Sequence, residues 1–135
     1  MATDGKRSGP ELTDAEVEAL HEVELTVECL RRAHGKLVEF HHDVGHAMDH
    51  LATAESVLRE SGHDDVADEI RDLYLPRGVI DEDRWSYDVL ESFEADFLAD
   101  LTDFEERARL EIADGRRHVA ERRQERAWKD RAERE

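Results

Sequence analysis

Proline, glycine and cysteine are all scarce in this sequence, and each shortage excludes a class of protein. Two prolines and seven glycines among 135 residues are too few for the many turns of a β-sandwich or β-barrel. The single cysteine, Cys29, cannot form an internal disulfide, which favours a reducing compartment. No apolar run approaches the length of a membrane span, and residues 1–8 lack the apolar segment of a secretory signal. We therefore expect one helical domain with a cytoplasmic location and no membrane contact.

Basic residues are also scarce relative to acidic ones. The sequence has 19 lysines and arginines against 36 aspartates and glutamates, a net charge of −17. Such a chain repels itself unless molar salt shortens the screening length to about 3 Å. An acidic, lysine-poor composition is typical of salt-adapted proteins, so we expect a halophilic protein in a salt-filled cytoplasm. The alternatives are an ordinary acidic protein and a disordered one, and the regular apolar spacing argues against disorder.

A long amphipathic helix is expected over residues 14–61, after a disordered leader at 1–12. Thr13 and Glu16 have the spacing of a capping box, which marks a helix start. Gly35 offers an alternative helix end. However, apolar residues recur at steps of three and four through this glycine, and their unbroken register favours one continuous helix. The heptad positions, here called the first seam, are Leu20, Val23, Val27, Leu30, His34, Leu37, His41, Val44, Met48, Leu51, Glu55 and Leu58.

A short helix and a second long helix are expected to follow. Residues 66–74 have the apolar spacing of a short helix, which Pro76 terminates. The acidic run Asp81-Glu82-Asp83 is then the expected start of the next helix. Its apolar positions repeat every eleven residues, so they form a nearly straight line, here called the second seam. These positions are Leu90, Phe93, Phe97, Leu101, Phe104, Ala108, Ile112 and Val119.

The predicted architecture is therefore all-α, with two long antiparallel helices joined by the short helix. Residues 13–114 form this helical hairpin, and residues 115–135 form a charged helical C-terminal extension. Two helices alone bury too little apolar surface to be stable. We therefore expect a homodimer that completes a four-helix bundle.

Five of the eight histidines lie between residues 34 and 50. His34 and His41 occupy the first seam, whereas His42, His46 and His50 follow at four-residue steps on the outer face. Imidazoles one turn apart suit chelation of a transition metal such as zinc, nickel or copper. The other interpretation is a polar layer that fixes helix register for the seam histidines and solvated surface for the rest. We favour this second interpretation and keep metal binding as the alternative.

Two Glu-x-x-His pairs, Glu18 with His21 and Glu39 with His42, have a spacing that di-iron bundles use. In such bundles the ligands point into the core. The heptad places all four of these residues on the solvent side, and the second long helix carries no matching pair. A di-iron site is therefore not expected.

The C-terminal segment 115–135 is the basic part of the chain. It holds eight basic and five acidic residues, a net charge of +3, against −20 for the remainder. Nucleic-acid contact is one hypothesis for this tail. However, its acidic residues are interleaved as helix-stabilising pairs, and high salt weakens phosphate contacts. We favour docking on the acidic body or on a protein partner, with Trp128, Arg122 and Arg123 as contact residues.

The turn between the helices contains Trp85 and neighbouring arginines, which make it another candidate partner surface. Packing of the loop itself is the alternative interpretation. The sequence has no phosphate-binding glycine loop, no paired Cys-x-x-Cys motif, no nucleophile elbow and no triad-like arrangement. We therefore expect neither enzyme activity nor a required cofactor.

Three segments, Leu75–Val79, Arg84–Glu91 and Asp114–Val119, together with Phe40–Gly45, resemble small helical haloarchaeal proteins of uncharacterised function. The resemblance covers about residues 20–125. It implies a salt-adapted helical fold and supplies no catalytic or binding residues. The sequence thus predicts a non-enzymatic helical interaction or scaffold module, with a metal-binding bundle or a nucleic-acid contact as the alternatives.

Overall fold

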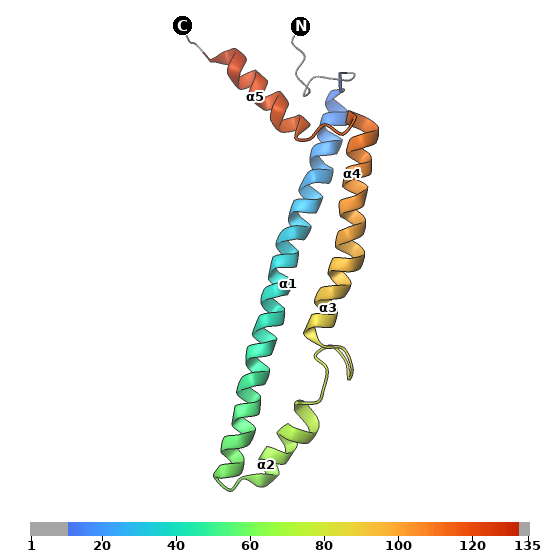
Figure 1. The fold of residues 1–135 in the computed structure, drawn as a ribbon. Coiled ribbons are helices and arrows are strands. Elements are labelled where there is room, and N and C mark those ends of the chain that lie inside the picture. Colours follow the sequence, from blue (N-terminus) through green and yellow to red (C-terminus); the bar gives the residue numbers. More distant parts are fainter. Residues whose placement is uncertain (1–10, 133–135) are drawn as a thin grey trace. The chain divides into compact units, whose positions relative to one another are not determined.

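The computed structural model describes residues 11–132, and within this range it is all-α and contains no strand (Figure 1). It contains a 47-residue helix and a 28-residue helix, which confirms the predicted all-helical class. The elements in chain order are α1 (Asp14–Glu60), α2 (Asp64–Glu69), η2 (Ile70–Tyr74), α3 (Ser86–Phe93), η3 (Glu94–Leu98), α4 (Ala99–Ala113) and α5 (Val119–Arg131). The η segments are π-helical turns, and η3 joins α3 to α4 within the 28-residue helix. None of the described helices is both long and apolar enough to cross a membrane.

Helix α1 begins and ends as the sequence predicts. The Thr13 N–H donates to Glu16 Oε1 at 2.9 Å, and the Glu16 N–H donates to Thr13 Oγ1 at 3.1 Å. This reciprocal capping box satisfies two donors of the first helical turn. The helix continues through Gly35 without a break and ends at Glu60, before Gly62 adopts a left-handed φ of 90°. The predicted continuity of the first helix is therefore confirmed.

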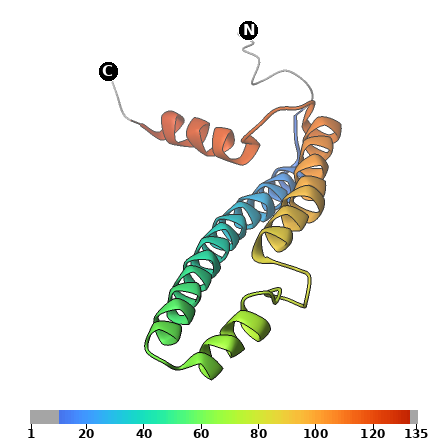
Figure 2. The same ribbon diagram turned by 60° about the horizontal axis from the view of Figure 1, so that its bottom comes forward.

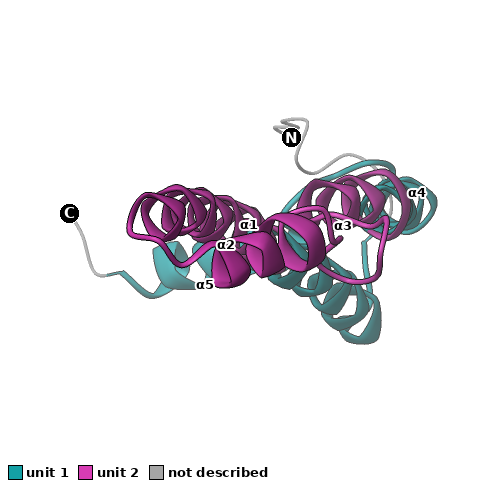
Figure 3. Ribbon diagram, turned by 90° about the horizontal axis from the view of Figure 1, so that it is seen from below, with its two compact units in different colours: residues 1–31, 98–135 teal, residues 32–97 magenta. Residues whose placement is uncertain are grey.

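The chain divides into two units, residues 1–31 with 98–135 and residues 32–97 (Figure 3). In the first unit, α4 lies beside the early part of α1 (Figures 1 and 2). The most deeply buried apolar residues of this unit are Val17, Leu20, Val27 and Ala113. Burial of these side chains provides the hydrophobic stabilisation of this unit.

In the second unit, an ion pair joins α2 to the end of α1. Arg59 donates to Asp68 Oδ1 at 2.9 Å and to Glu55 Oε2 at 2.8 Å. The hydrogen bonds to Glu55 and Asp68 raise the pKa of the Arg59 guanidinium above its ordinary value. Ala67 and Ile70 are the most deeply buried apolar residues of this unit. The predicted short helix is thus present, but of its predicted apolar residues only Ile70 is buried, whereas Val66, Leu73 and Tyr74 are exposed.

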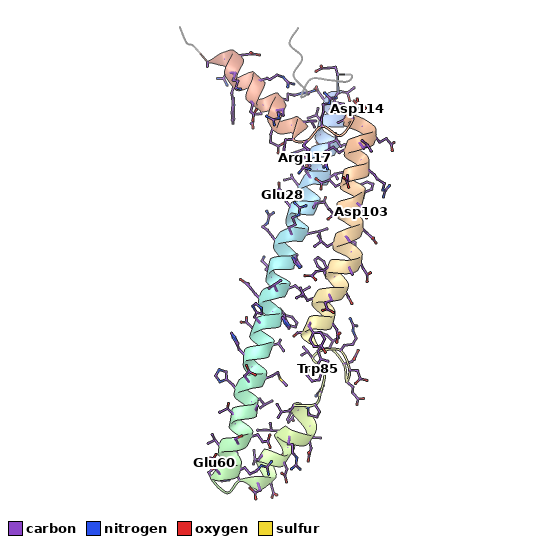
Figure 4. All side chains as sticks on the ribbon, in the orientation of Figure 1. Glu28, Glu60, Trp85, Asp103, Asp114 and Arg117 are labelled. Atoms are coloured by element: carbon purple, nitrogen blue, oxygen red, sulfur yellow. The ribbon has the colours of Figure 1, made fainter. Side chains whose placement is uncertain are left out.

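Two predicted helix boundaries are wrong. Asp81 and Arg84 form an isolated bridge within a turn, so the second long helix begins at Ser86 and not at the acidic run. That helix ends at Ala113, because Asp114 adopts a left-handed φ of 53° (Figure 4). Val119 therefore starts α5 and does not extend the second seam. Most of the predicted leader, residues 1–10, lies outside the described residues.

Candidate functional site

The two histidines of the first seam each meet a polar partner across the second unit. His34 Nε2 lies 2.6 Å from Glu94 Oε2, and the His34 ring stacks on Phe93 with ring centroids 6.2 Å apart. His41 Nδ1 lies 2.7 Å from the Oγ of Ser86, which is a buried side chain. Both imidazoles are half-buried. These contacts give each seam histidine a hydrogen-bond partner, which supports the interpretation of a polar layer.

The histidines of the outer stripe, His42, His46 and His50, are exposed. The His42 ring lies 5.6 Å from the His41 ring, centroid to centroid, without a shared ligand set. Within residues 11–132, none of the five predicted histidines belongs to a group of three close metal-ligating side chains. Metal binding by these histidines stays a prediction.

Trp85 lies in a tight turn and caps α3 (Figure 4). Its backbone N–H donates to Asp88 Oδ2 at 2.9 Å. Just before it, the Arg84 N–H donates to the Asp81 carbonyl at 3.2 Å, and Gly78 packs against this turn. A Cβ on Gly78 would collide with the Asp81 carbonyl and lie 2.7 Å from the Arg84 nitrogen. The turn is thus built by its own contacts, which supports the loop-packing interpretation of Trp85.

The predicted contact residues of the tail have different environments. Arg123 donates to Asp14 Oδ1 at 2.5 Å and therefore ties α5 to the start of α1 within the first unit. Arg122 pairs with Glu125 of the same helix at 3.5 Å. The Trp128 side chain is 59% exposed and remains available for a partner. Of these three residues, Arg123 makes an ion pair with another helix, although its partner Asp14 is 99% exposed.

A further cluster of metal-ligating side chains was not predicted from the sequence. His21 and Glu24 of α1 converge with Glu121 of α5, and one ligand atom from each lies within 4.8 Å of the others. His21, predicted to lie on the solvent side, has a side chain that is 36% exposed, and Glu121 in the first turn of α5 lies 3.7 Å from its Nδ1. The i,i+3 spacing of His21 and Glu24 was a visible signal. The third member depends on the chain reversal after Ala113, which the apolar spacing did not reveal.

Large apolar side chains are exposed at positions of both long helices. Phe97 and Phe104, on the second seam, are 54% and 43% exposed. The first-seam positions from Leu30 to Leu58 are half-buried, and none is fully covered. Isolated exposed apolar residues are ordinary on protein surfaces, and others lie off the seams, such as Val57 and Leu110.

Comparison with known protein families, with curated proteins and with solved structures found no match to this chain.

Proposed function

We propose that this chain is a non-enzymatic helical interaction module in which two copies associate through their seams into a four-helix bundle. The observation that carries this proposal is the exposure of Phe97 and Phe104 at second-seam positions. A phenylalanine at a seam position contributes to stability only when another apolar surface removes it from water. The occupant that best fits this surface is a second copy of the same chain.

The proposal has further support from the length of the uncovered seam. In α1, the deeply buried seam residues are Leu20 and Val27, near the beginning of the helix. From Leu30 to Leu58, the heptad pattern continues for four heptads, and the side chains at its seam positions are half-buried. A single facing helix covers one side of such a seam, so a second pair of helices is needed to cover the other side.

The directions of the two long helices favour this assembly. His34 meets Glu94, and His41, further along α1, meets Ser86, which comes earlier in the facing helix. The facing segments therefore run in opposite directions, as in an antiparallel hairpin. Two antiparallel hairpins that pack their seams together form a four-helix bundle. A stable interface of ordinary size buries roughly 800 Å² on each partner, and two partly exposed seams offer a surface of this kind.

The net charge of −17 sets the conditions for association. Two such chains repel each other over long distances at low ionic strength, whereas molar salt screens this repulsion. The apolar contact itself is strengthened by salts that are excluded from protein surfaces. We therefore propose that the module works in a salt-rich, cytoplasmic solution.

The alternative of nucleic-acid contact through the tail has less support. Arg123 is bound to Asp14, and Arg122 is paired with Glu125. A phosphate group would have to compete with these carboxylates in high salt, where its contacts are weakest. For α5, docking of the exposed Trp128 on a protein partner has more support than contact with nucleic acid.

The test is a double variant, Phe97→Ser with Phe104→Ser, whose oligomeric state is measured by sedimentation velocity in molar KCl. The control is Leu110→Ser, because Leu110 is 62% exposed on the same long helix but lies off the second seam. We expect the double variant to weaken self-association at least about 100-fold, since two buried aromatic anchors are lost. The control should retain the association of the native chain. Equal effects of both changes, with helicity retained, would contradict the proposed surface.

A further inference from the structure

We propose that His21, Glu24 and Glu121 form a binding site for a divalent transition-metal ion, with Zn²⁺ as the reference case. The site joins α1 to α5 within the first unit and uses none of the five histidines that the sequence singles out. It is independent of the proposed self-association, because its ligands are not seam residues.

The three ligand atoms lie close enough together to bind one ion. His21 Nδ1 lies 4.0 Å from Glu24 Oε1 and 3.7 Å from Glu121 Oε2. Around a tetrahedral zinc ion with ligand bonds of about 2.0–2.1 Å, neighbouring ligand atoms are roughly 3.3 Å apart. The two separations from His21 Nδ1 exceed that value by less than 1 Å. The arrangement leaves a fourth position for water.

Two polar atoms in the cluster have no hydrogen-bond partner. His21 Nδ1 and Glu121 Oε1 are both inaccessible to solvent, and neither has a hydrogen-bond partner. Buried polar atoms without partners are rare in folded proteins, because each one loses its interactions with water without replacement. A metal ion supplies the missing interaction at His21 Nδ1, and it also supplies the one at Glu121 Oε1 when this carboxylate binds through both oxygens.

Neighbouring groups of the chain position the ligands. The backbone N–H of His118 donates to Glu24 Oε2 at 3.3 Å, which leaves Glu24 Oε1 directed toward His21. Hydrogen bonds to the non-coordinating atom of a ligand fix its orientation in metal sites. Glu121 lies in the first turn of α5, where the helix dipole favours a carboxylate.

The donor set identifies the class of ion. One imidazole nitrogen and two carboxylates suit borderline divalent ions such as Zn²⁺ and Fe²⁺, and the harder Mn²⁺, better than soft ions, which prefer thiolates. The two carboxylates also attract a cation electrostatically. A bound ion would hold the C-terminal helix against α1 in addition to the Arg123–Asp14 contact.

The test uses the full chain, freed of metal with a chelator and titrated with Zn²⁺ by calorimetry in molar KCl. We expect one ion per chain and a rise in melting temperature on binding. Glu121→Gln and His21→Gln should each weaken the affinity at least tenfold. Glu125→Gln is the matched control, because it removes the same charge one turn further along α5 and should leave the affinity unchanged.

A second control separates this site from the histidine stripe. The triple variant His42→Gln, His46→Gln, His50→Gln should bind Zn²⁺ as the native chain does. Loss of binding in this triple variant, retained affinity in Glu121→Gln, or no Zn²⁺ binding by the native chain would overturn the proposal. Far-UV circular dichroism of each variant shows whether a loss of Zn²⁺ binding comes from unfolding.

Discussion

Left-handed backbone conformations at a few residues decide where the helices of this chain stop. Asp114, with a φ of 53°, and Gly115, with a φ of 83°, end the second long helix. His118, with a φ of 59°, then allows α5 to start in a new direction. An aspartate adopts this conformation more readily than most residues other than glycine. These three positions determine where α5 lies and thus where Glu121 is placed.

Gly78 is the glycine whose lack of a side chain matters most. A Cβ there would collide with the Asp81 carbonyl, so we expect Gly78→Ala to destabilise the protein by about 2 kcal/mol. Gly45 is the control, because a Cβ at that helical position meets no atom within 4 Å. Gly45→Ala should therefore stabilise the protein by about 1 kcal/mol. Thermal denaturation of both variants in molar KCl measures the two effects, and shifts of the same sign would contradict this account.

The sequence predicted single-residue roles well where the cause was local. The capping box of Thr13 and Glu16 depends on residues three apart, and it was correctly identified. The partners of His34 and His41 lie 60 and 45 residues away, so only their presence in a polar layer could be predicted. The clash that requires Gly78 arises from the fold of the loop and has no signal in the local spacing.

At the scale of the elements, α1 depends on the cap at its beginning. The prediction is that Thr13→Ala destabilises the protein by about 1 kcal/mol, because it leaves a helix N–H without its acceptor. Thr26 is the control, since its hydroxyl donates to the Glu22 carbonyl of the same helix and competes with the helical hydrogen bond. Thr26→Ala should have no cost or a small gain. Chemical denaturation followed by circular dichroism compares them, and an equal loss of stability in both variants would argue against the role of the cap.

The two long helices illustrate what apolar spacing can and cannot predict. A sustained heptad across residues 20–58 correctly predicted one helix through Gly35, because no competing signal ended it. The eleven-residue spacing wrongly included Val119, because an apolar period contains no information about a left-handed residue between two helices. The start at Ser86 was missed because the acidic run before it forms a turn, held by hydrogen bonds between residues three or four positions apart, in place of a first helical turn.

The candidate metal cluster shows the same limit. His21 and Glu24 are close in sequence, and their shared face could be predicted from helix geometry. Glu121 joins them only because the chain turns after Ala113, so the three-ligand cluster could not be derived from spacing alone. The five histidines between residues 34 and 50 were the predicted metal ligands. In the structure, His34 and His41 have polar partners, and the other three are exposed.

At the scale of the whole molecule, the net negative charge of −17 opposes compact folding. The chain carries 36 acidic residues against 19 basic ones, so dilute buffer leaves a large unscreened repulsion. We expect helicity, measured by far-UV circular dichroism, to rise from dilute buffer to molar KCl. Salt shortens the range of the repulsion and so favours the folded state. Full helicity in dilute buffer, unchanged by KCl, would contradict a salt-dependent fold.

The central claim is that the exposed seam is covered by a second copy of the chain. Sedimentation equilibrium of the native protein in molar KCl measures this most directly, because it gives the mass without reference to shape. The account predicts a concentration-dependent approach to about 31 kDa, twice the 15.6 kDa of one chain. A mass of 15.6 kDa at every concentration, for a fully helical protein, would contradict the account.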